Sequence, residues 1–313
     1  MQTNLFGETK YDEMLKQHSG SAFQTAPHIP YKGNKAAIVG HLCYLFPKCE
    51  HFLDACCGGG SVGYSMLAYG RAKQVTLNDI YKPIIDLHRA LMSGEHNIDF
   101  EHPQWCSREQ FFISTQKTTN GTYTPLDVAN EYLYSFGNNG RNYAYSREIE
   151  PYKKAMHEVV AGRTLNERRL ALKTFINILI KDGFKGADGH ESKLESLQRL
   201  ESLQRLESLE ILNSDIYEID YTPYDCVYFD IPYENTGGYK VEYSSTSFNH
   251  AKFWEFFTNL PQLAFASSYT APEGVPIAKE INKRVLMQNK TNNSMQQGKE
   301  KVYVNKPDYE SND

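Results

Sequence analysis

A short polar stretch near residue 230 has the residue types and the setting for chemistry. Residues 226–229 are apolar and favour a β-strand, and Pro232 cannot donate a hydrogen bond to a neighbouring strand, so the strand should end near Ile231. A carboxylate (Asp230) and an aromatic ring (Tyr233) are then left at the carboxyl end of a strand, where open α/β sheets bind ligands. The alternative is a strand-terminating turn with a solvated aspartate.

A glycine-rich turn followed by a spaced aspartate forms a second constellation. The segment HFLDACCGGGSVGYSMLAYG (51–70) predicts a strand, a turn and a helix from Ser61, and the next strand, QVTLND, ends at Asp79. Glycines let the backbone pass close under a ligand, and an acid 19 positions after Gly60 can accept both hydroxyls of a ribose. The glycines lack the GxGxxG spacing, which disfavours a nicotinamide oxidoreductase. A cofactor without a pyrophosphate, such as S-adenosylmethionine, is favoured.

Composition narrows the class of protein. The chain has 313 residues, 40 % of them hydrophobic, which is enough for a real core, and a formal net charge of −5, which argues against a broadly basic nucleic-acid binder. It contains no apolar run of the roughly 18 residues that a membrane helix needs, and its amino terminus lacks a secretory pattern, so we expect a cytoplasmic protein. Six cysteines without a CxxC pair predict reduced thiols and no metal.

Five motifs occur in the order found in Dam-type DNA adenine-N6 methyltransferases, and the chain resembles this family over residues 27–305: PYKGNK (30–35), FLDACCGGGSVG (52–63), LNDIY (77–81), NSDIYEI (213–219) and YFDIPY (228–233). A further segment, residues 135–157, resembles a branch common in phages and prophages. The resemblance implies an α/β fold: a Rossmann-like, S-adenosylmethionine-dependent methyltransferase sheet with a helical target-recognition insertion. It also implies site-specific methyl transfer to the N6 amine of adenine in double-stranded DNA by base flipping, without a metal, by a monomer or weak dimer.

The same resemblance assigns roles to individual residues. Asp230, Ile231, Pro232 and Tyr233 form the catalytic strip, in which Asp230 and a backbone carbonyl accept hydrogen bonds from the adenine amine and Tyr233 stacks on the flipped base. Lys35 meets the methionine carboxylate of the cofactor. The complete predicted cofactor set is Tyr31, Lys35, Asp54, Gly58, Gly60, Asp79 (on the ribose), Asp215 (on the adenine amine) and Ile216.

The sequence departs from the family pattern at two places. Ile231 stands where the family usually has the first proline of Asp-Pro-Pro-Tyr; it keeps the carbonyl, and because it precedes Pro232 it is pushed towards extended backbone. A β-branched side chain could crowd the flipped base and lower the rate. Asp54-Ala55-Cys56-Cys57 stands where the family often has Glu-Pro-Phe, and we interpret the paired cysteines as small core residues rather than catalysts.

Domain organisation follows from a change in character along the chain. We predict a flexible arm over residues 1–26, a discontinuous catalytic domain over 27–105 and 191–313, and a helical target-recognition domain over 106–190, with helices at 125–136, 150–160 and 164–181. Residues 141–190 hold ten Lys or Arg against six Asp or Glu, a local charge of +4. The predicted DNA-contacting residues are Arg141, Tyr143, Tyr145, Arg147 and Lys153; the alternative is a solvated helical face.

Leucine at every third position marks residues 194–212, LESLQRLESLQRLESLEIL. Such leucines wind around a helix axis instead of forming one stripe, and we expect a helix that leads into a strand. After the catalytic strip we expect a helix at 248–260, a strand at 263–269, and an antiparallel pair at 284–290 and 299–305. We expect TNNSMQQG, between the two strands, to be a hairpin loop or a disordered loop.

Three other functions remain open from the sequence. The strip could serve the N4 amine of cytosine, or Ile231 could mark a DNA-binding relic without activity. A glutamine methyltransferase of peptide-release factors would use Asn at the position of Asp230 and would not need the basic insertion. The setting, whether restriction-modification, evasion of phage defence or regulation, is not determined by the residues.

Overall fold

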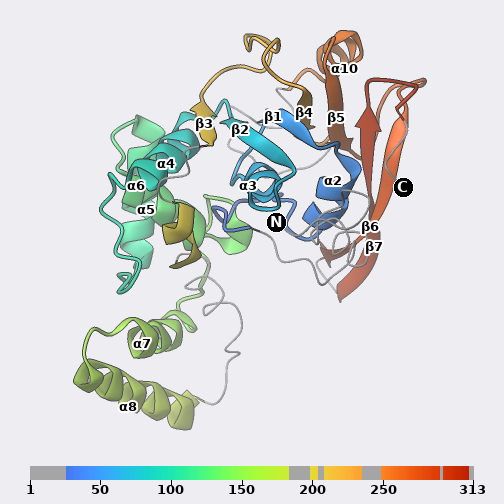
Figure 1. The fold of residues 1–313 in the computed structure, drawn as a ribbon. Helices are drawn as coiled ribbons and strands as arrows, with labels where there is room; N and C mark the ends of the chain where they lie inside the picture. The colour runs from blue at the N-terminus through green and yellow to red at the C-terminus, as the bar shows by residue number, and fades with distance from the viewer. Residues whose placement is uncertain (1–25, 183–197, 204–207, 235–247, 290–291, 310–313) are drawn as a thin grey trace, which may run out of the picture. The chain divides into compact units, whose positions relative to one another are not determined.

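The computed structural model describes residues 26–182, 198–203, 208–234, 248–289 and 292–309, and Figure 1 shows the course of the chain. The described residues form two compact units. The first contains Ala26, residues 34–82 and the residues from 208 onward; the second contains residues 27–33 and 83–203. The described part of the insertion expected at 106–190 lies in the second unit, which also takes in residues 83–105.

The described part of the first unit is built on one seven-stranded sheet in the order β3-β2-β1-β4-β5-β7-β6. Strands β3, β2, β1, β4 and β5 run parallel, whereas β7 is antiparallel to both β5 and β6. The strand order reverses between β1 and β4, which is the switch point where open α/β sheets bind ligands. The strands are β1 (Cys49–Asp54), β2 (Ala72–Asn78), β3 (Leu209–Leu212), β4 (Cys226–Asp230), β5 (Leu263–Ser268), β6 (Ile277–Asn289) and β7 (Asn292–Val304).

These bounds confirm the predicted strands and the closing antiparallel pair. The prediction of a loop over TNNSMQQG is wrong, because residues 292–298 belong to β7 and pair with β6. The local signal was misleading, since polar residues with a glycine usually mark a turn. Here the two strands are long, and their ladder continues to the pair Asn289 and Asn292.

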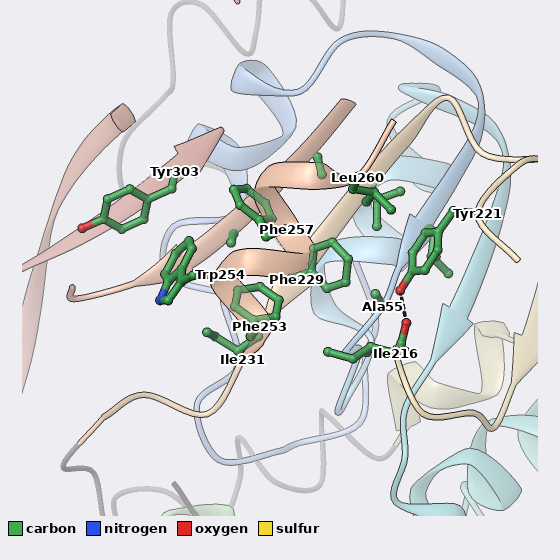
Figure 2. Close-up of a cluster of buried hydrophobic side chains, with 14 of the residues drawn as sticks. Ala55, Ile216, Tyr221, Phe229, Ile231, Phe253, Trp254, Phe257, Leu260 and Tyr303 are labelled. Carbon is green, nitrogen blue, oxygen red and sulfur yellow. Dashed lines mark hydrogen bonds between the residues drawn. The ribbon is translucent and has the colours of Figure 1, made fainter. Parts of the chain in front are cut away.

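Helix α10 (His250–Asn259) covers one face of the sheet and packs there in a hydrophobic cluster, which Figure 2 shows. Side chains of alternate strand residues enter this cluster because strand side chains point to opposite faces with a period of two. The ring of Phe229 lies 5.4 Å from that of Phe253, and Trp254 lies 5.3 Å from Tyr303. The buried members are Leu53, Ala55, Ile216, Tyr221, Tyr224, Val227, Phe229, Ile231, Phe253, Trp254, Phe257, Leu260, Ala264, Ala266 and Tyr303.

The opposite face carries α2 (Val39–Leu45) and α3 (Ser61–Ala68). Phe46, at the end of α2, packs its ring 5.7 Å from Phe52, 5.2 Å from Tyr228 and 4.8 Å from Phe265. Phe52 on β1 and Tyr228 on β4 are therefore the alternates of the residues that face α10. The polar side chains at the end of the same alternation, Asp54 and Asp230, belong to this face.

The described part of the second unit is helical. Its elements are α4 (Lys82–Ser93), α5 (Arg108–Asn120), α6 (Pro125–Leu133), the 3-10 turn η1 (Phe136–Asn138), α7 (Glu150–Ala161), α8 (Leu165–Asp182) and the 3-10 turn η2 (Glu201–Leu203). These bounds confirm the helices predicted at 125–136, 150–160 and 164–181. Helix α5 was not predicted; it starts at Ser107, whose hydroxyl accepts a hydrogen bond from the backbone of Gln110, and it ends at Gly121 with φ of 73°.

The leucine repeat is described in part. Residues 198–200 are helical, η2 follows, and Leu200 and Leu203 are buried at 1 % and 3 % exposure. Residues 208–212 form a turn and β3, which confirms the predicted strand. The helix predicted over 194–197 and 204–207 lies outside the described residues.

Replacement of Gly63 by alanine tests the contact between α3 and β2. A Cβ atom at Gly63 would lie 2.3 Å from Cδ2 of Leu77 and 3.3 Å from Cβ of Asp54. We expect Gly63→Ala to lower the free energy of unfolding by about 1–3 kcal/mol through overpacking, although alanine favours helices. Ala68→Gly, on the exposed end of the same helix, measures helix propensity alone; chemical denaturation in which Gly63→Ala is as stable as the wild type would contradict the tight packing.

Candidate active site

The site forms at the carboxyl ends of β1 and β4, on the face of the sheet that α2 and α3 cover. Asp54 is the last residue of β1 and pairs in register with Tyr228, two positions before Asp230 at the end of β4. Ser267 of β5 pairs with Asp230, and its hydroxyl lies 2.7 Å from that of Tyr228. The parallel register thus places these polar groups side by side at the switch point.

A buried ammonium group meets the predicted catalytic aspartate. Nζ of Lys35 donates hydrogen bonds to Oδ1 and Oδ2 of Asp230 at 2.6 and 2.5 Å, although 195 residues separate them. Lys35 is 5 % exposed and Asp230 21 %. Burial alone would lower the pKa of Lys35, but the charge of Asp230 and the neighbouring acids raise it, so the lysine is charged at neutral pH.

Two further side chains complete this cluster, Tyr233 and Glu300. The hydroxyl of Tyr233 donates a hydrogen bond to Oε1 of Glu300, a fully buried residue of β7, and the same oxygen lies 3.9 Å from Nζ of Lys35. Nζ of Lys35 also lies 5.2 Å from the centre of the Tyr233 ring. The Tyr233 ring meets the edge of Tyr269 at 4.6 Å. Sequence reasoning missed Glu300, because a lone acid among lysines in a strand carries no local signal.

The side chain of Ile231 points away from this cluster. Ile231 is fully buried in the hydrophobic cluster beside Phe253, as Figure 2 shows, on the opposite face of the sheet from Asp230. The next residue, Pro232, is held through its carbonyl, which lies 2.8 Å from Nε2 of His250 at the start of α10. His250 is a second residue that the sequence did not reveal.

The glycine turn after β1 is held by Asp79, the residue that follows β2. Gly58 and Gly60 adopt φ of 48° and 78°, a region that favours glycine. The backbone amide of Gly58 donates to Oδ2 of Asp79 at 2.9 Å, and the amide of Tyr81 donates to Oδ1 at 2.9 Å. Asp54 accepts from the amide of Gly63 at 2.9 Å. The predicted turn and both acids therefore form one connected loop cluster.

Asparagines tie this cluster to the end of β3. Nδ2 of Asn78 donates to the carbonyls of Ala55 and Ser214, each at 3.0 Å, and Asn213 donates to the carbonyl of Asp79 at 2.7 Å. Asp215 accepts from the backbone of Tyr217 at 3.0 Å and so also forms a turn. Asn78 escaped the sequence analysis, which singled out only the acid beside it.

Ile216 lies mainly in the core. Its side chain is 7 % exposed in the cluster of Figure 2, where its carbonyl accepts a hydrogen bond from the hydroxyl of Tyr221 at 2.6 Å. The neighbouring Tyr217 packs its ring 5.3 Å from Phe256 of α10. The segment after β3 is thus anchored on the α10 face.

Burial and mutual repulsion raise the pKa values of acids in the site. The pKa of Asp54 is raised to about 7, chiefly by burial and also by the charges of Asp230 and Asp79, while the hydrogen bond from the Gly63 amide opposes the rise. Burial also raises the pKa of Asp79, and it raises that of Glu300 to about 7. Burial raises the pKa of Cys56 and Cys57 well above the usual range, so both are thiols at neutral pH and unsuited to nucleophilic attack.

The predicted DNA-contacting residues all lie in the second unit. Arg147 is exposed and Arg141 is half-buried, whereas Tyr143, Tyr145 and Lys153 are buried. The hydroxyl of Tyr143 donates to the carbonyl of Cys106 at 2.9 Å, and the Tyr145 ring stacks on Trp105 at 5.6 Å. The predicted cofactor residue Tyr31 also groups with this unit, and its ring lies 4.9 Å from that of Tyr132.

The strand order and the glycine turn at the switch point define a Rossmann-like α/β fold of the methyltransferase type. The model of the D12 class N6 adenine-specific DNA methyltransferase family matches residues 31–281, well over half of the chain, so the chain belongs to this family. It is therefore an enzyme that methylates the N6 amine of adenine in DNA with S-adenosylmethionine.

A solved structure of the rRNA methyltransferase aviRa from Streptomyces viridochromogenes is similar over 85 % of this chain and 81 % of its own, at 12 % identity and a TM-score of 0.31. That level of likeness carries no argument about this site. In the described part of the chain no helix is long and apolar enough to cross a membrane.

The residues present fit the cofactor of this family. Glycines with positive φ leave the turn after β1 without side chains, and the carboxylates of Asp54, Asp79 and Asp230 lie close enough to raise the pKa of Asp54 together. Such a cluster of acids suits a ligand with a sulfonium, an ammonium and ribose hydroxyls.

Asp54→Asn tests how much the ionised Asp54 in this cluster of acids lowers the free energy of unfolding. The pKa of Asp54 is raised by folding, so the folded state binds the proton more tightly than the unfolded chain, and stability present at low pH is lost as the pH rises from about 4 to 7. The amide variant does not ionise, so we expect its free energy of unfolding to exceed that of the wild type by about 1–4 kcal/mol at pH 8, with a smaller difference at pH 4.5.

Denaturation at both pH values measures this difference. Asp220→Asn is the control, because the pKa of Asp220 is lowered by hydrogen bonds from Thr222 and its substitution should act in the opposite direction. An Asp54→Asn variant whose stability relative to the wild type does not rise with pH would refute the shift.

Proposed function

We propose that Asp230, Ile231, Pro232 and Tyr233 form the catalytic strip for adenine. The observation that carries this proposal is the position of the Asp230 carboxylate at the end of β4, where both of its oxygens are held by Lys35 while a fifth of the side chain stays exposed. Each carboxylate oxygen has two lone pairs, so Asp230 can accept the adenine amine while it keeps Lys35.

The strip acts on the amine through position and charge. Hydrogen bonds from the amine to Asp230 and to the carbonyl of Ile231 localise the nitrogen lone pair, which is otherwise delocalised into the ring. When bound, S-adenosylmethionine supplies an electrophilic methyl group on a sulfonium. Tyr233 provides a ring on which a flipped base stacks. The hydrogen bond between Pro232 and His250 keeps the strip in place.

The cofactor would be held by the loops at the switch point. Asp79 would accept from the ribose, Asp54 with Gly58 and Gly60 would line the methionine portion, and Asp215 with the backbone at Ile216 would bind the adenine. Lys35 would reach the methionine carboxylate from its place beside Asp230, since an ammonium carries three donors. Tyr31 is proposed to cover the cofactor, as the family resemblance implies.

The second unit would contact double-stranded DNA. Arg147 and Arg141 are the residues proposed to meet phosphates or base edges, because Arg147 is exposed and Arg141 is only half-buried. Tyr143, Tyr145 and Lys153, the buried members of the predicted set, would act by supporting the loop that presents the two arginines. The proposed setting is a phage-like branch that works in the cytoplasm as a monomer or weak dimer.

Replacement of the catalytic acid tests the strip. Wild type, Asp230→Ala and Asp230→Asn are incubated with unmethylated duplex DNA and S-adenosylmethionine, and the nucleosides are measured by mass spectrometry. We expect N6-methyladenine from the wild type and a loss of about 10²- to 10³-fold in kcat in both variants, because the acceptor charge is gone. Cofactor affinity, measured by calorimetry, should change less than kcat.

Stability must be followed in parallel, because a buried Lys35 without its main partner costs about 3–5 kcal/mol. Assays are therefore run below the unfolding transition, with Asp220→Asn as an exposed carboxylate control. N4-methylcytosine as the product would favour the cytosine alternative. A wild type that binds DNA and cofactor and methylates nothing would favour the inactive relic, an outcome that the burial of Ile231 argues against.

Arg147→Ala tests the proposed DNA surface. Removal of one phosphate contact should weaken DNA binding a few-fold at low salt and reduce the slope of log K against log salt by about 1, because fewer counterions are released. Fluorescence anisotropy over a salt series measures both. Lys73→Ala, which removes an exposed cation paired with Glu50 on the sheet unit, is the control; equal slopes for Arg147→Ala and the wild type would remove Arg147 from the interface.

A further inference from the structure

We propose that Glu300 is a positioning residue of the methyltransferase: its carboxylate holds the hydroxyl of Tyr233 and so fixes the ring that stacks on the flipped adenine. The inference rests on the proposed roles of Asp230 and Tyr233, and it adds a residue from the last strand of the sheet to the site.

The register of the sheet places Glu300 on the correct face. Val302 of β7 pairs with Ser267 of β5, which in turn pairs with Asp230 of β4. Because side chains alternate along a strand, Glu300 lies on the same face as Val302 and therefore on the face of Asp230. Tyr303, of the opposite parity, lies in the α10 cluster, which agrees with this assignment.

The contacts of Glu300 converge on the strip. It accepts the hydrogen bond from Tyr233, and its Oε1 lies 3.9 Å from Nζ of Lys35, which is itself bound to both oxygens of Asp230. One buried ammonium thus stands between two carboxylates, and the phenol of Tyr233 is tied to the second of them. A fully buried carboxylate is costly unless such partners surround it.

These contacts indicate that Glu300 orients the Tyr233 ring and does not hold Lys35. The Lys35 ammonium is closer to Asp230, at 2.5 Å, than to Glu300, at 3.9 Å, so Asp230 holds the lysine. The hydrogen bond to Tyr233 is the direct contact that Glu300 makes with the strip. It restrains the phenol at its far end, while Tyr269 meets the ring from the side.

Two conservative variants separate the position of the Glu300 acceptor oxygen from the charge of its carboxylate. Glu300→Gln keeps an acceptor oxygen at the same distance without the charge, whereas Glu300→Asp keeps the charge and withdraws the oxygen by one methylene. If Glu300 positions Tyr233, kcat of Glu300→Gln stays within about threefold of the wild type, and Glu300→Asp loses about 10- to 100-fold, since a misplacement of about 1 Å can cost that much.

A double-mutant cycle with Tyr233→Phe shows whether the effect passes through the phenol. We expect Tyr233→Phe to lose as much as Glu300→Asp, and the double variant to lose no more than either, with KM for DNA and cofactor affinity little changed. With 2-aminopurine at the adenine that the wild type methylates, Tyr233→Phe and Glu300→Asp should both show brighter fluorescence, because the flipped base is less well stacked.

The controls separate this inference from the proposed strip. Glu280→Asp shortens a half-exposed acid on the neighbouring strand, where it pairs with Lys299, and should leave kcat unchanged. Three outcomes refute the role of Glu300 and leave the strip intact when Asp230→Ala is inactive. Glu300→Asp could keep full kcat, Glu300→Gln could be the impaired variant, or the losses in the double-mutant cycle could add. If Asp230→Ala is fully active, the strip itself is wrong.

Discussion

The two-residue period of β4 is the constraint on which this site depends. Phe229 and Ile231 must enter the core under α10, and the same geometry turns Tyr228 and Asp230 to the other face. A slip of one residue would bury the carboxylate among aromatic rings and turn Phe229 and Ile231 to the face that α2 and α3 cover. The hydrophobic cluster therefore fixes the direction of the Asp230 carboxylate.

This division also separates the two demands on Ile231. Its side chain belongs to the core, and only its carbonyl is proposed to serve the site, so the two requirements are independent. An aliphatic residue satisfies the first, and the proline after it restricts the backbone for the second. The α10 face thus accommodates a residue that looked, from the sequence, like a threat to the flipped base.

Buried charge sets the positions in the site more than it contributes stability. An ion pair removed from water stabilises a fold little relative to a packed apolar pair, yet loss of one partner is costly. The pairing of Lys35 with Asp230 therefore links the segment before α2 to the end of β4. Burial of charge is also unfavourable at other acids of the site, such as Asp54, whose ionised form is disfavoured by burial.

The features that the sequence predicted are those with local signals. The glycine turn, the acid that follows β2 and the helices α6, α7 and α8 all follow from spacing within about twenty residues. Helix α5 was missed because its apolar residues lack clear helical spacing, although Ser107 and Gly121 mark its ends. His250 and Glu300 act through contacts with Pro232 and Tyr233 that no local pattern encodes.

The sequence also did not show which residues of the basic segment are buried. Tyr143 and Tyr145 have the residue types of a nucleic-acid surface, but in the structure they pack with aromatic rings around Trp105. Aromatic side chains serve both purposes, and only the tertiary neighbours distinguish them.

The long separation of the interacting residues has a consequence for synthesis of the enzyme. Lys35 and Asp230 are 195 positions apart, and Tyr233 waits for an acid 67 positions later, on a strand that lies between β5 and β6. Closure of such loops is slow and entropically unfavourable until the sheet can form. A nascent chain whose basic helical segment has been made therefore still lacks the assembled acid cluster. With the roles proposed for the two units, the ability to hold DNA would precede the ability to modify it.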